Sequence, residues 1–262
     1  LELLDNAKFF PANLKQSQAG YIEWANMRPC ARKRGLGTQI PYDRDWIVEP
    51  LSDSTIYQML YMISHLIREK PEVIEKLSFE VLDYIYFGDG NPSKLNIDSE
   101  FLKAAREQVM YWNNVDFRYV GMPHMSNHLN FLIYHYSLIF PKSMWPKTIV
   151  AGNLMMRDGE KISKSKGNGT PLFRMKNQYG SDLYRLYIGV NSNCDVEMDF
   201  KEDEIVNLSK KFDRWTDLIG KSLECKKKEF ENYSEIDKWL ISKFYESAKL
   251  YFENFENFKI RE

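Results

Sequence analysis

Two short apolar segments, each followed directly by a glycine, constrain the fold of this chain most. Residues 115–120 alternate like a half-buried strand and precede Gly121, and the Thr-Ile-Val segment at 148–150 precedes Gly152. Residues 126–140, between them, carry apolar side chains at helical spacing. Strands that alternate with helices predict a parallel α/β sheet, which binds ligands in the crevice at the carboxyl ends of its strands. Both glycines are expected at that edge.

Further helices are expected on both sides of this region. Residues 98–112 have helical periodicity, and so does a segment that ends at Arg68 and that Ser52 and Asp53 are expected to cap. From Phe200 onward the sequence contains only helical periodicity, in two long segments around residues 205–223 and 236–258. The predicted fold class is therefore α/β followed by all-α, the second part a helical bundle.

The composition excludes several classes of protein. The 36 basic residues balance 37 acidic ones, so that any contact with nucleic acid has to come from local patches. Three cysteines, far apart and without metal-ligand spacing, indicate neither a disulfide framework nor a zinc site, and a reducing cytoplasm is expected. No apolar run approaches the roughly 20 residues of a membrane span, and the first 20 residues do not resemble a signal peptide. We expect a soluble cytoplasmic protein.

A polar loop at residues 157–170 carries the clearest chemical signal. It follows residues 153–156, which are expected to continue the strand before Gly152. Residues 157–176 contain six basic side chains and two acidic ones. Lysine ammoniums act as mobile point charges, and serine hydroxyls and glycine amides add hydrogen bonds, so the pattern suits a phosphate ligand. A solvated Lys/Ser surface loop is the alternative.

The sequence of this loop is similar to a known signature. Lys161-Ile162-Ser163-Lys164-Ser165 resembles the Lys-Met-Ser-Lys-Ser signature of class I aminoacyl-tRNA synthetases, with isoleucine in place of methionine. The following Lys-Gly-Asn at 166–168 also fits, and residues 179–187 resemble the helix that comes after this loop in the family. Two linked blocks in the family's order favour the phosphate-binding interpretation over a plain surface loop.

Other blocks resemble leucyl-tRNA synthetases of the archaeal and eukaryotic cytosolic type. They are residues 35–41, 46–49, 51–57, 115–118 and 127–129. The resemblance covers essentially the whole chain and is weakest over residues 71–112. It implies that residues 1–195 form the second half of a Rossmann-type nucleotide-binding catalytic domain, and that residues 196–262 begin the anticodon-binding helical bundle.

The resemblance also implies roles for individual residues. Lys161 and Lys164 would neutralise the pyrophosphate leaving group. ATP would be held by residues of three segments: Gly121 near the ribose or adenylate, Gly152, Asn153 and Leu154 at the adenine, and Ser163 and Ser165 in the signature loop. The leucine pocket would include His128, with Tyr57 and Tyr61, one helical turn apart, as further candidates. The alternatives are a packed or capping role for the histidine and an aromatic core for the tyrosines.

The reaction implied is activation of leucine by ATP, with Mg²⁺ bridging phosphates, followed by transfer to tRNA(Leu). Two departures from the family pattern leave a paralogue without aminoacylation activity, tRNA-binding or regulatory, as an alternative. Met122-Pro123-His124 replaces a polar pair with an acidic residue for the ribose, and Asn153 replaces a histidine. A class I synthetase for isoleucine, valine or methionine is another alternative. No His-Ile-Gly-His tetrapeptide occurs and both ends look cut, so we expect the chain alone to be inactive without an N-terminal half.

Overall fold

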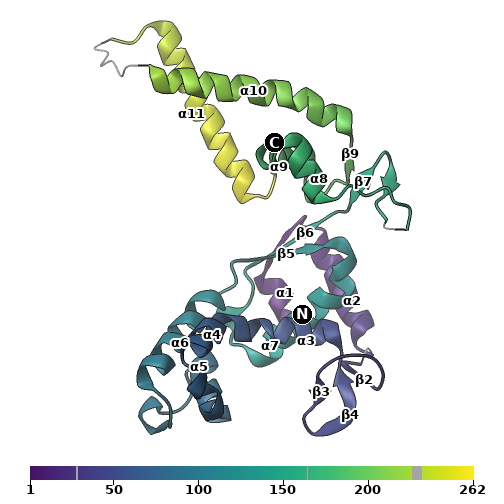
Figure 1. The fold of residues 1–262 in the computed structure, drawn as a ribbon, viewed down its shortest axis with the longest axis vertical. Coiled ribbons are helices and arrows are strands. Elements are labelled where there is room, and N and C mark those ends of the chain that lie inside the picture. The colour runs from purple at the N-terminus through teal and green to yellow at the C-terminus, as the bar shows by residue number, and fades with distance from the viewer. Residues whose placement is uncertain (28, 164, 226–231) are drawn as a thin grey trace. The chain divides into compact units, whose positions relative to one another are not determined.

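A computed structural model gives the structure of the chain, and it describes all residues except 28, 164 and 226–231. The described residues form two compact units, Leu1–Ala151 and Gly152–Glu262, each of which is considered by itself (Figure 1). This division differs from the predicted domains, which follow the family pattern and place their boundary after residue 195. The assignment of those domains stays a prediction. No helix among the described residues is long and apolar enough to cross a membrane.

The first unit is built on a three-stranded sheet in the order β1-β6-β5, with bounds Lys8–Phe10, Thr148–Gly152 and Phe117–Gly121. β1 and β6 are parallel, with Phe9 opposite Ile149. The expected strands are thus present and end at the two glycines, whereas β1 was not predicted. The core around the sheet includes side chains of α1 (Glu2–Asn6), α2 (Leu14–Ala25) and α7 (Asn130–Ile139), and α3 (Pro50–Ile56) packs against α7.

A second apolar cluster of the first unit joins three helices, α4 (Gln58–Glu69), α5 (Phe79–Phe87) and α6 (Ser99–Trp112). Ile63, Ile85 and Val109, one from each helix, are completely buried in it. Local sequence explains the helix ends: the Ser78 hydroxyl accepts from the Val81 amide at the start of α5, and Gly88 ends that helix with φ of +80°. The periodicity of residues 98–112 therefore predicted α6 correctly.

Short elements complete the first unit. β2 (Ala31–Arg32), β4 (Asp43–Val48) and β3 (Gln39–Ile40) form an antiparallel sheet in that order, which the sequence did not predict. The remaining helical turns are 3₁₀ helices at Pro71–Lys76, Pro92–Lys94, Met122–His124 and Lys142–Met144, and a π-helical turn at Met125–Leu129.

The second unit combines a small sheet with helices. β8 (Glu160–Lys161), β7 (Met155–Arg157) and β9 (Met198–Phe200) pair in that order, β7 antiparallel to β8 and parallel to β9. The helices are α8 (Leu172–Tyr179), α9 (Ser181–Asn191), α10 (Glu202–Glu224) and α11 (Glu235–Glu256). Buried Met175, Tyr187 and Phe200 belong to the core that joins α8, α9 and β9 to the start of α10.

Several boundaries differ from the expectation. The helix expected through Arg68 is interrupted at Tyr57 and forms two helices, α3 and α4. The first of them is capped by Glu49, whose carboxylate accepts from the amides of Leu51 and Ser52. It begins there because Pro50 occupies its first turn. Residues 155 and 156 do not continue β6 but form β7 in another sheet.

The C-terminal region is helical, as predicted, although it also contains β9, which pairs with β7. Two adjacent hydrogen-bonding strands of three residues each are too short to show period-two alternation clearly. α11 buries none of its residues, and its apolar side chains are largely exposed, among them Trp239, Phe244 and Tyr251. The long helices are therefore confirmed, whereas the helical bundle stays a prediction.

Candidate functional site

In the first unit, the candidate site lies where β5 ends at Gly121. This residue has an ordinary extended backbone, with φ of −74° and ψ of 141°, and a Cβ added there would meet only the Pro123 ring, at 3.8 Å. The turn therefore does not require glycine. The chain continues through the 3₁₀ turn, with Pro123 in its first positions, and the π-helical turn into α7. The predicted helix over residues 126–140 thus begins as a wider turn.

His128 lies in the π-helical turn, half-buried, and contacts Arg118 of β5. An Arg118 Nη2 atom is 3.3 Å from Nδ1 of His128. Because a guanidinium can only donate, Nδ1 must accept, so His128 is neutral and carries its proton on Nε2. Burial, followed by electrostatic interaction with Arg118 and with His124, holds the pKa of His128 below its ordinary value. The imidazole can therefore offer Nε2–H as a donor.

Arg118 itself is a site residue that the sequence analysis missed. Its Nε atom is buried without a hydrogen-bond partner, and burial lowers the pKa of the guanidinium. It forms no ion pair with an acidic side chain of the part of the chain that the structure describes. The alternation of β5 contained the signal, since Arg118 and buried Val120 are two residues apart and share one face of the strand.

His135 of α7 is a second residue that the sequence did not single out, and it contacts two residues of the block at 51–57. Its Nε2 lies 3.2 Å from the Ser52 hydroxyl and its Nδ1 lies 2.5 Å from the Thr55 hydroxyl, both on α3. The Thr55 hydroxyl also donates to the Ser52 carbonyl at 2.9 Å, so it accepts from Nδ1–H of His135. Ser52 in turn donates to Nε2. The block thus fixes α3 against α7 through a neutral histidine, whose pKa burial lowers.

Tyr57 and Tyr61 contact each other edge to face, with ring centroids 5.5 Å apart. The two residues are 46% and 63% exposed, so the alternative of an aromatic core is wrong. Among the described residues, the tyrosine pair and the Arg118–His128 pair share no hydrogen bond or ring contact. Whether they line one pocket therefore stays a prediction.

The predicted adenine segment connects β6 to β7. Gly152 is the buried last residue of β6, and Asn153 and Leu154 are half-buried in the connection that follows. The Asn153 amide donates to the Cys194 carbonyl at 3.5 Å. The residue that replaces the family's histidine is thus tied to the segment after α9.

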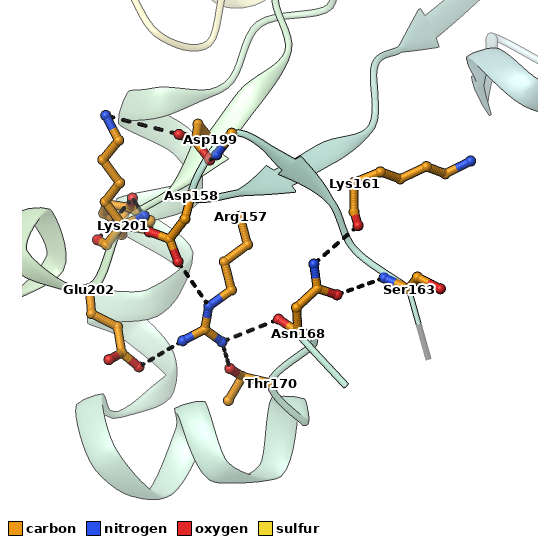
Figure 2. A network of polar contacts seen from close by, with 11 residues as sticks. Arg157, Asp158, Lys161, Ser163, Asn168, Thr170, Asp199, Lys201 and Glu202 are labelled. Atoms are coloured by element: carbon orange, nitrogen blue, oxygen red, sulfur yellow. Dashed lines mark hydrogen bonds and ion pairs between the residues drawn. The ribbon is translucent and has the colours of Figure 1, made fainter. Parts of the chain in front are cut away.

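The signature loop follows the β7–β8 hairpin in the second unit. Lys161, at the end of β8, is exposed and has no ion pair among the described residues, and its side chain extends away from the polar network in Figure 2. The hydroxyls of Ser163 and Ser165 lie 2.8 Å apart. Lys164 lies outside the described residues. The structure therefore brings Ser163 and Ser165 together and leaves Lys161 available to a ligand.

Two basic residues that contribute to the local positive charge are already engaged. Lys166 forms an ion pair with Glu160 at 2.9 Å. Arg157 lies between Asp158 and Glu202, each at 3.7 Å, and its guanidinium also lies over the Phe200 ring. These side chains are part of the loop's framework, so Lys161 is the better candidate for contact with phosphate.

The described residues contain no group of three His, Cys, Asp or Glu side chains that could hold a metal ion.

Comparisons with known proteins agree with the resemblance of the loop. A model of the family described as tRNA synthetases class I (M) matches residues 102–218. The chain is 40% identical over 244 residues to the leucine–tRNA ligase of Staphylothermus marinus, covering 92% of this chain and 25% of that protein. It is 34% identical over 262 residues to the leucine–tRNA ligase of Methanocaldococcus jannaschii, covering 98% and 28%.

A solved structure supports the fold. The methionyl-tRNA synthetase of Mycobacterium tuberculosis, in complex with methionyl-adenylate, has a TM-score of 0.63 and 16% identity, covering 98% of this chain and 45% of that one. At this identity the likeness concerns the fold alone. The chain spans about a quarter of the length of the curated relatives that it matches. It belongs to the class I tRNA synthetase family, in which it is similar to one segment of archaeal leucine–tRNA ligases.

Proposed function

We propose that the protein containing this chain is a leucine–tRNA ligase, which joins leucine to tRNA(Leu) with ATP in the cytoplasm. The observation that carries the proposal is the signature loop, in which exposed Lys161 precedes two serines whose hydroxyls lie 2.8 Å apart. The leucine–tRNA ligases at 34–40% identity support leucine as the amino acid. Isoleucine, valine and methionine become outcomes of the test.

In the first step, a carboxylate oxygen of leucine attacks the α-phosphorus of ATP, and the bond from that phosphorus to the bridging oxygen breaks. Pyrophosphate leaves with the electron pair, and leucyl-adenylate remains. We assign charge stabilisation of the leaving pyrophosphate to Lys161 and Lys164, with hydrogen bonds from Ser163 and Ser165. Mg²⁺ bound to the ATP phosphates supplies further positive charge there.

The same proposal assigns Gly152, Asn153 and Leu154 to the adenine, and Gly121 to the ribose or adenylate. A residue without Cβ lets a ligand approach the backbone, and the open space around Gly121 supports this role.

For the leucine pocket we propose His128, Tyr57 and Tyr61, and we add Arg118. The Nε2–H group that the Arg118 contact leaves on His128 is a neutral donor. The half-buried guanidinium of Arg118, without an acidic partner among the described residues, suits a carboxylate such as that of an amino acid.

Other parts of the ligase have further roles in this proposal. We propose that an N-terminal half supplies the opposite side of the ATP site, and that the region from residue 196 onward, with α10 and α11, begins the part that reads tRNA. The exposed apolar side chains of α11 are consistent with packing against further helices.

A second candidate is a paralogue that keeps the fold but does not aminoacylate. Its support is the 3₁₀ turn after Gly121, where Met122, Pro123 and His124 offer no carboxylate to a ribose. The test is leucine-dependent exchange of pyrophosphate into ATP, measured with the complete protein. Exchange supports the ligase, and its absence with intact tRNA binding supports the paralogue.

A further inference from the structure

We propose that Asn168 and Arg157 are positioning residues, which fix the shape of the signature loop and connect it to the start of α10. This inference rests on the proposed function of the loop in ATP chemistry. Neither residue contacts the phosphates in this account. They act through the backbone of residues 161–163, from which the Lys161 side chain extends (Figure 2).

The Asn168 side chain closes the loop by pairing with backbone groups on both sides of Ile162. Its Oδ1 accepts from the Ser163 amide at 2.8 Å, and its Nδ2 donates to the Lys161 carbonyl at 3.1 Å. These two backbone groups belong to one edge of an extended segment, so the side-chain amide takes the place of a peptide group on a neighbouring strand. The loop between residues 163 and 168 is thereby closed at its base.

The next residue supports the same closed shape. A Cβ added to Gly169 would lie only 3.2 Å from Cγ2 of Ile162. The backbone at Gly169 therefore lies against the Ile162 side chain. Since side chains alternate along an extended segment, Lys161 and Ser163 are directed away from Ile162. The two hydrogen bonds of the Asn168 side chain, to the Ser163 amide and the Lys161 carbonyl, are called the clasp. The clasp thus determines on which face of the segment 161–163 the Lys161 side chain lies.

Arg157 anchors this clasp to the remainder of the second unit. Its Nη1 atom donates to the Asn168 carbonyl at 3.5 Å and to the Thr170 hydroxyl. The Nη2 atom lies 3.7 Å from a carboxylate oxygen of Glu202, in the first turn of α10. The Arg157 side chain is 24% exposed, so these contacts are shielded from solvent more than a surface ion pair is.

One guanidinium therefore joins β7, the returning side of the signature loop and α10. A shift of the first turn of α10 would move Glu202 and alter the contacts of Arg157, and through Asn168 it would alter the position of Lys161. A planar fork with several donors is needed for this arrangement, because a lysine could not hold the loop and Glu202 at once.

The experiment compares Asn168→Ala and Arg157→Lys with wild type in the complete protein. Asn177→Ala is the matched control, since the Asn177 side chain is exposed on α8 and makes no hydrogen bond within the described residues. The first measurement is leucine-dependent ATP–pyrophosphate exchange, resolved into kcat and the KM for leucine. The second is hydrogen exchange of the Ser163 amide, which reports on the clasp without requiring activity.

We expect Asn168→Ala to lower kcat about a hundredfold, as for a displacement of about 1 Å in a positioned group, with the KM for leucine unchanged. The Ser163 amide should exchange faster. Arg157→Lys should lower kcat about tenfold by the same reasoning, and Asn177→Ala should match wild type in both measurements.

Unchanged Ser163 exchange in Asn168→Ala would show that the clasp does not form, and faster exchange with wild-type kcat would show that it does not position the loop. Either result overturns the inference. Wild-type protein without leucine-dependent exchange would instead overturn the proposed function, while the hydrogen-exchange measurement would still report whether the clasp exists.

Discussion

Arg118 of β5 donates a hydrogen bond to Nδ1 of His128 at 3.3 Å, and this contact determines which ring nitrogen of the histidine carries the proton. A protonated His128 would present N–H to the guanidinium in place of a lone pair, and two cations would face each other. The contact therefore agrees in direction with the lowering of the His128 pKa by burial and by the Arg118 charge.

If His128 contributes to the leucine pocket, His128→Ala should raise the KM for leucine about tenfold or more and leave the KM for ATP nearly unchanged, as expected for loss of one ligand hydrogen bond. His65→Ala, on α4, is the control. A variant that only unfolds at lower temperature, with both constants intact, would return His128 to a structural role.

The same histidine predicts a pH dependence. The folded pKa is lower than the ordinary value of 6.5, so the neutral form is the one that folding stabilises. The contribution of neutral His128 to the free energy of unfolding is complete above pH 6.5 and is lost as pH falls through the pKa of the folded state. The free energy of unfolding of wild type should therefore decline as pH falls below 6.5, and it should decline less in His128→Ala. Identical pH profiles would contradict the assignment.

Substitution of Gly121 distinguishes a glycine needed for ligand approach from a glycine needed for the backbone conformation. Gly121→Ala should leave the melting temperature unchanged, because φ is ordinary and the new Cβ has room beside Pro123. If the ribose or adenylate lies against this backbone, the KM for ATP should rise about tenfold, or roughly 1.4 kcal/mol. Unaltered ATP kinetics would mean that nothing approaches Gly121 closely.

The contact of α3 with α7 predicts a loss of stability. His135→Ala removes the hydrogen bond donated by Ser52 and the one accepted by Thr55, and leaves the buried Ser52 hydroxyl without its acceptor. We expect the free energy of unfolding to fall by about 1–3 kcal/mol, measured by urea denaturation. Ser54→Ala is a suitable control, since within the part of the chain that the structure describes that hydroxyl bonds only to the Leu51 carbonyl. Equal stability of His135→Ala and wild type would show that the network contributes nothing.

The signature lysines have the largest predicted effect. Lys161→Ala and Lys164→Ala should each slow leucine activation by two to three orders of magnitude, about 3–4 kcal/mol, because each removes a charge that meets the leaving group. Binding of leucine should barely change. Lys210→Ala, an exposed lysine of α10, provides the comparison. Near-normal exchange in both signature variants would remove the loop from the chemistry.

Much of the fold could be predicted because the hydrophobic periodicity of the helices is clear and glycines mark the ends of two strands. β5 and β6 end at the glycines that the sequence singled out, and α6, α10 and α11 follow long periodic segments. β1, β9 and the β2-β4-β3 sheet were missed because these strands are two to six residues long, and their pairing depends on partners distant in sequence. Glu49 was overlooked as a cap because glutamate is not among the preferred capping residues.

In the candidate site, too, some residues could be predicted from the sequence and others could not. The signature loop was found because lysines and serines alternate in it, and its exposed Lys161 fits the predicted role. Arg118, His135 and Arg157 were not identified, since their importance comes from partners 10 to 83 positions away. Asn168 was noticed only as part of a resemblance. Its clasp depends on the turn that returns the chain beside residues 161–163.

The central claim is that the loop at residues 161–165 serves leucine activation. The most direct measurement is ATP–pyrophosphate exchange by the complete protein, with leucine, isoleucine, valine and methionine tested in parallel, and with the 262-residue chain tested by itself. We expect exchange with leucine at least about a hundredfold faster than with the other three, since leucine alone would fit the pocket without loss of contacts, and none from the chain alone. Equal or faster exchange with another amino acid, or no exchange with any of them, would contradict it.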